Sequence, residues 1–165
     1  MKKTVLKCLA ALLTASGVFA QSSIKSSELL TLQEAARILN MEMKIDEGYF
    51  DKPESGGGLR TVYETTATEH LYLFQISVKP NAERSYKAIR QMYENDESVI
   101  QVKGLGHWAC ILVKPVFSLY IFHGEYFVNI SLSRIGRNPL RNEEEEIIWR
   151  TEKVKEAGKL AVGRL

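Results

Sequence analysis

The side chains best suited to chemistry are one cysteine and two histidines between positions 107 and 123. Cys110 is a potential nucleophile and His107 or His123 its base, because a thiol ionises at neutral pH only beside a base or a cation. The same three side chains offer the sulfur and nitrogen ligands that suit zinc or copper. Either site requires these side chains to converge, which depends on how the chain between them folds.

The local pattern argues against both kinds of site. Cys110 lies within the apolar run 108–113, which predicts a buried strand, and burial among apolar side chains raises the pKa of a thiol and makes it unreactive. Residues three apart on a strand point to opposite faces, so His107 and Cys110 converge only if the preceding glycine turn bends the chain. We therefore predict a structural thiol, and no metal or cofactor.

Other catalytic signatures are absent from the sequence. Glu64, Glu69, Asp96 and Glu125 fall in predicted turns or strands, where a solvated charge is the usual case. The patterns G-x-S-x-G, H-E-x-x-H and the P-loop do not occur. The triple glycine at 56–58 precedes a β-rich stretch rather than a helix start, which disfavours a phosphate cradle. The sequence therefore predicts no catalytic residues and a protein that is not an enzyme.

The first twenty residues have the pattern of a secretory signal peptide. A head with three lysines precedes an apolar body, and Val18 and Ala20 supply the small side chains that a signal peptidase requires before Gln21. The apolar body is shorter than the roughly 20 residues of a membrane-spanning helix. We therefore expect residues 1–20 to be removed, leaving a periplasmic or secreted protein with no integral membrane span.

Removal of the signal peptide changes the charge of the chain. Three of the 22 Lys and Arg residues and none of the 20 acids lie in the first twenty positions, so the formal charge falls from +2 to 19 − 20 = −1. A nearly neutral chain gives no electrostatic reason to expect a nucleic-acid partner. Only Cys110 remains of the two cysteines, so an internal disulfide is excluded.

The remaining chain predicts one α+β domain. The polar, serine-rich segment 21–30 is interpreted as a flexible leader, and 31–165 as a single domain. Helices are predicted after the Thr31 to Glu34 capping box, from about Asn81 and from Glu143. Strands are predicted at 59–66, 70–78, 108–113, 116–122 and 126–133, with a strand or edge segment at 98–103. These elements form an antiparallel sheet of about five to six strands covered by helices.

Two predicted turns flank the strands at 108–113 and 116–122, and they concentrate glycines, an aromatic ring and two histidines. Recognition residues tend to lie on loops held by a rigid sheet, and a tryptophan beside a glycine turn can anchor a partner through its large apolar area. Trp108 also begins a predicted strand, so a core position is an equal alternative. The predicted binding surface comprises Gly104, Leu105, Gly106, His107, Trp108, His123, Gly124 and Glu125.

Four short motifs occur in an order that resembles a known group of domains. They are E-A-A-R-I-L at 34–39, G-L-G-H-W-A at 104–109, the hairpin around Gly124 and the tail Arg164-Leu165. This order resembles a broad group of small secreted and lipoprotein domains of unknown function with a PsbP-like fold, in which an acid usually stands at the position of His107. The resemblance implies an α/β/α sandwich with a non-enzymatic binding or assembly role, and it identifies no functional residue.

Two functions stay open. The first is an exported binding or assembly module that contacts a protein or cell-envelope component through the sheet or the glycine turn. The second is a periplasmic protein that binds a small molecule or metal through His107 and His123. A broad apolar patch would favour the first, and a concave pocket with convergent polar groups the second.

Overall fold

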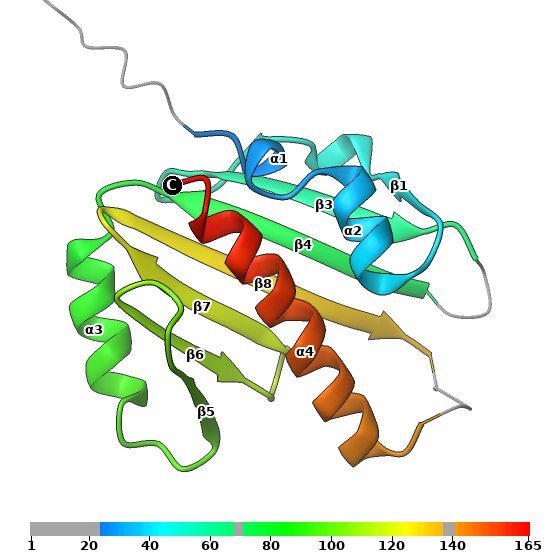
Figure 1. Cartoon of the computed structure of the whole chain (residues 1–165). Helices are drawn as coiled ribbons and strands as arrows, with labels where there is room; N and C mark the ends of the chain where they lie inside the picture. The colour runs from blue at the N-terminus through cyan, green and yellow to red at the C-terminus, as the bar shows by residue number, and fades with distance from the viewer. Residues whose placement is uncertain (1–23, 68–70, 137–140) are drawn as a thin grey trace, which may run out of the picture.

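The computed structural model describes residues 24–67, 71–136 and 141–165. Within these ranges the protein is an α+β fold with eight strands in one sheet, four α-helices and a 3-10 turn (Figure 1). In chain order the elements are α1 (Ser26–Leu29), α2 (Leu32–Leu39), β1 (Met43–Ile45), η1 (Glu47–Tyr49), β2 (Lys52–Pro53), β3 (Leu59–Thr65), β4 (Leu71–Lys79), α3 (Glu83–Tyr93), β5 (Val99–Val102), β6 (Trp108–Leu112), β7 (Ser118–His123), β8 (Tyr126–Ile135) and α4 (Glu143–Val162).

The sheet is open and antiparallel, with the strand order β1-β3-β4-β8-β7-β6-β5 and the short β2 paired to β3. Strands β5 to β8 form a meander in which consecutive strands pair, and β8 also pairs with β4. The β4 and β8 pair is long, running from the partners Leu71 and Ile135 to Lys79 and Phe127. This central pair joins the two halves of the sheet.

Helices α1, α2 and α4 lie on one face of the sheet, and α4 crosses β7 and β8 (Figure 1). Alternate side chains of the central strands, such as Phe74 and Ile130, are fully buried beneath them, as period-two alternation requires. Val154 and Ala157 of α4 are also fully buried. The main hydrophobic core is therefore the layer between this face and the three helices.

The opposite face is covered by α3 over β6 to β8. Tyr86 of α3 lies with its ring centroid 4.7 Å from that of Phe122 on β7, while the neighbouring Ile121 belongs to the core on the other face. Helices thus cover both faces, as expected for a helix-covered sheet. Towards β3 and β4 this face carries polar side chains, among them Gln75, Ser77 and Ser131.

The predicted elements are confirmed with small shifts at their ends. The Thr31 and Glu34 capping box is present, and α4 begins at Glu143 behind a second capping box between Asn142 and Glu145. His70, the predicted first residue of the second strand, lies outside the described residues. The sheet has more strands than the five to six expected, because β1 and β2 pair with the outer edge of β3 from a charged, glycine-rich segment without strand periodicity.

Residues 24–30 depart from the flexible leader predicted for 21–30. Leu29 and Leu30 are at most 1% exposed, because these apolar side chains fill the space between the sheet and the end of α4. Asp51 accepts hydrogen bonds from the Ser26 and Ser27 hydroxyls and from the Ser27 amide. The segment is therefore part of the fold, whereas the predicted signal peptide lies outside the described residues.

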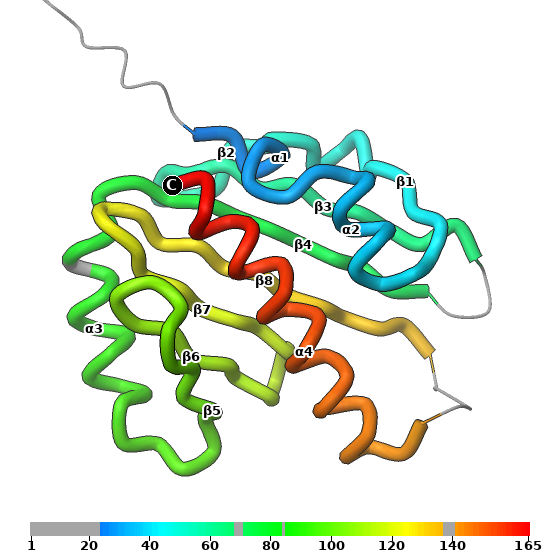
Figure 2. Tube along the Cα trace, viewed as in Figure 1, coloured from blue at the N-terminus to red at the C-terminus, as the bar shows by residue number. Residues whose placement is uncertain are grey.

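The carboxyl end of the chain closes on this amino-terminal segment (Figure 2). Arg164 donates hydrogen bonds to the carbonyl oxygens of Glu28 and Leu29, and its guanidinium pairs with Glu34 at 2.5 Å. The hydrogen bonds between the Arg164 and Glu34 side chains hold the guanidinium pKa above, and the Glu34 pKa below, their usual values, with the pKa of Glu34 at about 2. The arginine of the tail motif thus joins α4 to α1 and α2.

Candidate functional site

The two turns that carry the predicted binding surface lie against each other. The backbone N–H of His107 donates a 2.7 Å hydrogen bond to the carbonyl oxygen of Phe122. Gly106 has a φ of 65°, and a Cβ atom added there would lie 2.6 Å from the same oxygen. Only glycine combines this φ with so close an approach, so Gly106 holds the β5–β6 turn against the end of β7.

Leu105 points into the core rather than towards solvent. Its side chain belongs to the main hydrophobic cluster and is 5% exposed. A Cβ atom added at Gly158 of α4 would lie 2.9 Å from Leu105 Cδ2, so α4 approaches the glycine turn closely. Because a buried side chain offers no contact area, Leu105 cannot belong to the predicted binding surface.

Trp108 is half-buried in an aromatic cluster between α3 and the sheet. Its ring centroid lies 6.2 Å from that of Tyr86 on α3 and 5.9 Å from that of Phe122, both in tilted arrangements. Tilted pairs at these distances are favourable for aromatic rings. Of the two alternatives for Trp108, the structure therefore supports packing within the fold.

The two predicted histidines converge at the surface. The rings of His107 and His123 are stacked with centroids 5.3 Å apart, and His107 Nδ1 accepts a 3.2 Å hydrogen bond from the Gly124 amide. His107, Gly104, Gly124 and Glu125 are exposed. A cavity of about 220 Å³ lies beside His107 and is lined mainly by aromatic rings, including Tyr86, Phe122 and Tyr126. This corner offers one exposed imidazole next to a small aromatic hollow.

Cys110 is buried away from solvent on β6. Its side chain has no exposed surface, and burial raises the pKa of the thiol to about 12. It pairs across the sheet with Gln101 and Tyr120, whereas His107 contacts His123 and the Gly124 amide. Within residues 24–67, 71–136 and 141–165 there is no group of three or more His, Cys, Asp or Glu side chains that could hold a metal ion. The predicted burial of Cys110 is confirmed.

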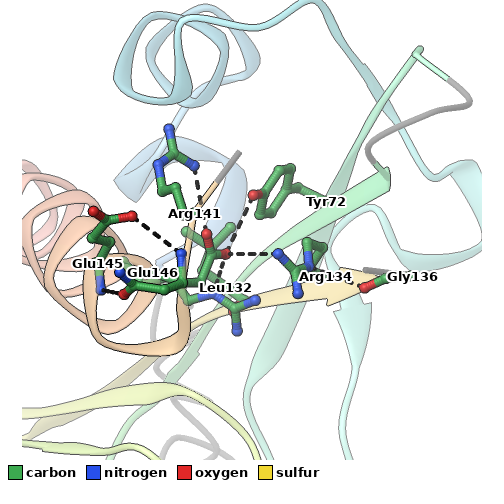
Figure 3. Close-up of polar contacts among 9 residues, drawn as sticks. Tyr72, Leu132, Arg134, Gly136, Arg141, Glu145 and Glu146 are labelled. Atoms are coloured by element: carbon green, nitrogen blue, oxygen red, sulfur yellow. Dashed lines mark hydrogen bonds and ion pairs between the residues drawn. The ribbon is translucent and has the colours of Figure 1, made fainter. Parts of the chain in front are cut away.

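A second region, at the amino-terminal end of α4, has a different character. A cavity of about 370 Å³ lies between this helix end, β8 and the β6–β7 turn. Glu146 lies at its wall with a side chain 9% exposed, and Figure 3 shows Tyr72, Arg134 and Arg141 turned towards its carboxylate. The described residues that line the cavity are Val113, Lys114, Phe117, Arg134, Arg141, Asn142, Glu143, Glu146, Ile147 and Arg150.

All three arginines that line the cavity contact the Glu146 carboxylate. Arg150 Nε donates to Glu146 Oε1 at 2.9 Å, Arg141 Nη1 lies 3.5 Å from Oε2, and Arg134 Nη1 lies 3.8 Å from Oε1. The Tyr72 hydroxyl donates to Oε1 at 3.2 Å. Burial and the neighbouring Glu146 charge raise the pKa of Tyr72, so this phenol is a hydrogen-bond donor at neutral pH.

The positive charge around the cavity exceeds the negative charge. Among the lining residues, the cations Lys114, Arg134, Arg141 and Arg150 face the acids Glu143 and Glu146, which leaves a net charge of +2. Lys114 and Glu143 pair with each other at the rim at 3.5 Å. Arg134 Nη1 is buried and makes no hydrogen bond within the part of the chain that the structure describes. The excess positive charge can therefore pair with the charge of a bound anionic group.

The sequence analysis did not single out the members of this cluster. Arg141 lies in a basic, glycine- and proline-containing segment, and Glu146 lies in an acidic helix start. The one local signal is the spacing of Glu146 and Arg150, four residues apart on a helix, which predicts an ion pair. Arg134 joins them only because the end of β8 lies close to the first turns of α4 in the folded chain.

Comparisons with protein-family models, with curated proteins and with solved structures found no match for this chain. The likeness to PsbP-like domains therefore stays a prediction. Among the described helices, none combines the length and the apolar character needed to cross a bilayer.

Proposed function

We propose that this chain is an exported, non-enzymatic binding protein, and that its ligand site is the arginine-lined cavity at the start of α4. The ligand carries a carboxylate or a phosphate group. The observation that carries the proposal is the convergence of three guanidinium groups on a cavity of about 370 Å³ that contains one buried carboxylate. This is the second of the two functions left open by the sequence, at a site other than the histidines.

Arginine suits this role for geometric reasons. Its planar guanidinium carries five N–H donors and binds carboxylate or phosphate with two parallel hydrogen bonds. Arg141 makes one hydrogen bond to Glu146 at 3.5 Å, and its guanidinium lies over the Trp149 ring at 4.3 Å. The Trp149 ring positions the guanidinium plane of Arg141, and most of the guanidinium N–H groups are left for a ligand.

A purely structural role of the cluster is the main alternative. Glu146 connects α4 to β8 through Arg134 and to β4 through Tyr72, and such a junction needs no ligand. One carboxylate, however, balances one arginine, and side chains of excess cations are usually placed in water. Arg134 and Arg150 are 18% and 16% exposed, so the excess charge lies in a sheltered site that favours an anion.

Titration with acetate and with inorganic phosphate tests the proposal. Arginine Nε–Hε signals would be followed by NMR, with chloride at equal ionic strength as the reference salt. We expect saturable shifts of the cavity arginines with at least one of the two probes. In Arg141→Gln the response should weaken at least about tenfold, the effect of losing one charge-assisted interaction of roughly 1.5 kcal/mol.

Arg37→Gln is the matched control, because Arg37 is an exposed arginine on α2 whose ion pair with Glu156 is 4.0 Å long. It should leave the response unchanged. Equal weakening in both variants, or shifts no larger than those with chloride, would overturn the arginine site. Export is tested separately by the intact mass of the chain recovered from the exported fraction, where retention of Met1 would contradict it.

A second candidate function is supported by the histidine corner. The exposed His107 ring lies beside the 220 Å³ aromatic cavity, which is of a size to accept one apolar side chain of a protein partner from the cell envelope. A photo-crosslinking residue at position 107 should then trap one partner that excess unlabelled protein displaces. The same crosslinker at Lys44, an exposed position on β1, should trap none; equal labelling at both positions would reject this function.

A further inference from the structure

The arginine-lined cavity is joined by a second, apolar cavity. This second cavity has a volume of about 320 Å³ and lies at the ends of β5 and β6, where Ser98, Val99 and Leu112 line it. Four residues line both cavities, namely Val113, Lys114, Glu143 and Ile147. Because four residues line both spaces, the cavities are adjacent, and a ligand that extends past Val113 and Ile147 can contact both.

The two cavities differ in chemistry. The first contains the three arginines and Glu146, whereas the second takes its lining beyond the shared wall from two apolar side chains and one serine. Val113 and Ile147 continue the apolar surface from one cavity into the other. A site that is cationic at one end and apolar at the other complements a molecule with one anionic group and a hydrocarbon chain.

We propose that the ligand is an anionic amphiphile, with its carboxylate or phosphate group among the arginines and its aliphatic chain in the cavity beside Val99 and Leu112. This inference rests on the proposed function and specifies the class of ligand. At about 30 Å³ for a group the size of a water molecule, a volume of 320 Å³ holds on the order of ten methylene groups. Medium-length chains therefore fit.

The exposed ion pair between Lys114 and Glu143 lies at the boundary of the two cavities. Its atoms are 3.5 Å apart and both side chains are about four-fifths exposed, so the pair is weak. It connects the β6–β7 turn to the first turn of α4, and both residues line both cavities. The flexible stem of Lys114 can cover the chain of a ligand while its ammonium group stays in water.

Calorimetric titration with butyrate, octanoate and 1-octanol tests the inference below the micellar range. Each methylene group buried should tighten binding by about two- to fourfold, so octanoate should bind at least about tenfold more tightly than butyrate. Octanol, which lacks the charge, should bind at least about tenfold more weakly than octanoate. The three probes thus measure the anionic and apolar ends separately.

Two variants alter the apolar end by different means. Leu112→Gln removes apolar lining from a half-buried position, and Ser98→Trp fills the cavity from an exposed one. Both should reduce the ratio of octanoate to butyrate affinity to about twofold or less. Ile100→Gln is the control, since Ile100 is a 39% exposed residue of β5 that does not line this cavity.

The outcomes separate the inference from the function on which it rests. Equal affinity for butyrate and octanoate, or a tenfold preference that persists in both variants, would overturn the aliphatic chain while the anion site stands. Octanol binding as tightly as octanoate, or an absence of binding by all three probes, would overturn the arginine site together with the inference.

Discussion

The histidine corner and the arginine cavity differ in charge, although each contains one buried nitrogen, His123 Nδ1 and Arg134 Nη1, without a hydrogen bond within the described residues. At the corner, the backbone of the glycine turn is hydrogen-bonded to β7, Leu105 is buried and Trp108 packs on α3. At the cavity, three arginines share one carboxylate, and Arg134 Nη1 has no hydrogen bond within the described residues. The conspicuous glycine-turn motif can thus be explained by packing. The charged residues of the cavity, which are scattered along the sequence, form a site with excess positive charge.

The difference also concerns what removal of a residue leaves behind. Truncation of Leu105 leaves a cavity in the core, whereas removal of Glu146 leaves cations without their buried partner. The first change affects stability alone. The second should affect both stability and the response to anions, and this distinction provides the sharpest tests of the comparison.

Replacement of Glu146 by alanine should have the largest effect. We expect the free energy of unfolding to fall by about 3 kcal/mol, the lower end for a broken buried ion pair, because the arginines keep 16–29% of their surface and can turn towards water. Urea denaturation at neutral pH measures the change. Acetate should then stabilise the variant more than the wild-type protein, since it can replace the missing carboxylate.

Glu144→Ala is the control for that experiment. Glu144 is an exposed acid in the same first turn of α4, so both variants lose the same favourable interaction with the helix dipole. An equal loss of stability in the two variants would show that Glu146 acts only as a first-turn acid. Glu146 would then not be the residue that holds the three arginines at the cavity.

Leu105→Ala should have the next largest effect and should change stability alone. Loss of a leucine from a packed core costs about 2–4 kcal/mol, depending on how far the site can collapse, and Leu105 lies directly against Gly158 of α4. Thermal and urea denaturation would measure it, with Ile148→Ala, at a position 55% exposed, as the control. A loss below about 1 kcal/mol would place Leu105 at the surface after all.

The Arg164 and Glu34 ion pair should contribute less, and its contribution should depend on pH. Glu34 has its pKa lowered to about 2, against about 4.3 for a free glutamate. Because the pKa of the folded state is the lower one, the stabilisation is present above about pH 4.3 and is lost as the pH falls towards 2. Arg164 is 36% exposed, so solvent screening reduces the effect of Arg164→Ala to about 1 kcal/mol.

Denaturation curves between pH 2 and 7 would test the pair. The difference in stability between wild type and Arg164→Ala should be present at pH 7 and disappear near pH 2. Arg90→Ala is the control, because Arg90 pairs with Glu94 on the exposed side of α3. A difference that stays constant over the whole range would mean that Arg164 acts through its hydrogen bonds to the Glu28 and Leu29 carbonyls rather than through its charge.

Local signals predicted most of the fold, and they failed where the partner is distant in sequence. The capping box at Thr31 and the strand at 126–133 depend on residues within a few positions, and both are confirmed. The strands β1 and β2 and the buried Leu30 are determined by contacts with β3 and with the sheet. The convergence of Arg134 and Arg150 depends likewise on tertiary packing, which no spacing along the chain reveals.

His107→Ala should have the smallest effect on stability. The side chain is exposed and its contacts are the stack on His123 and the 3.2 Å hydrogen bond from Gly124, so we expect a loss of about 0.5 kcal/mol. Gly106→Ala, which places a Cβ atom 2.6 Å from the Phe122 carbonyl oxygen, should destabilise more. Urea denaturation of both variants would show whether the turn is held by the glycine or by the imidazole.

If His107→Ala instead destabilised as much as Gly106→Ala, the imidazole would be a structural part of the corner and unavailable to a partner. The expected result leaves His107 as an exposed side chain on a rigid turn, since the hydrogen bond from its backbone N–H to Phe122 is kept in the alanine variant. Loss of partner binding at an unchanged stability would then assign the corner to recognition. An unchanged response to acetate in the same variant would show that the two regions act independently, as their separate linings imply.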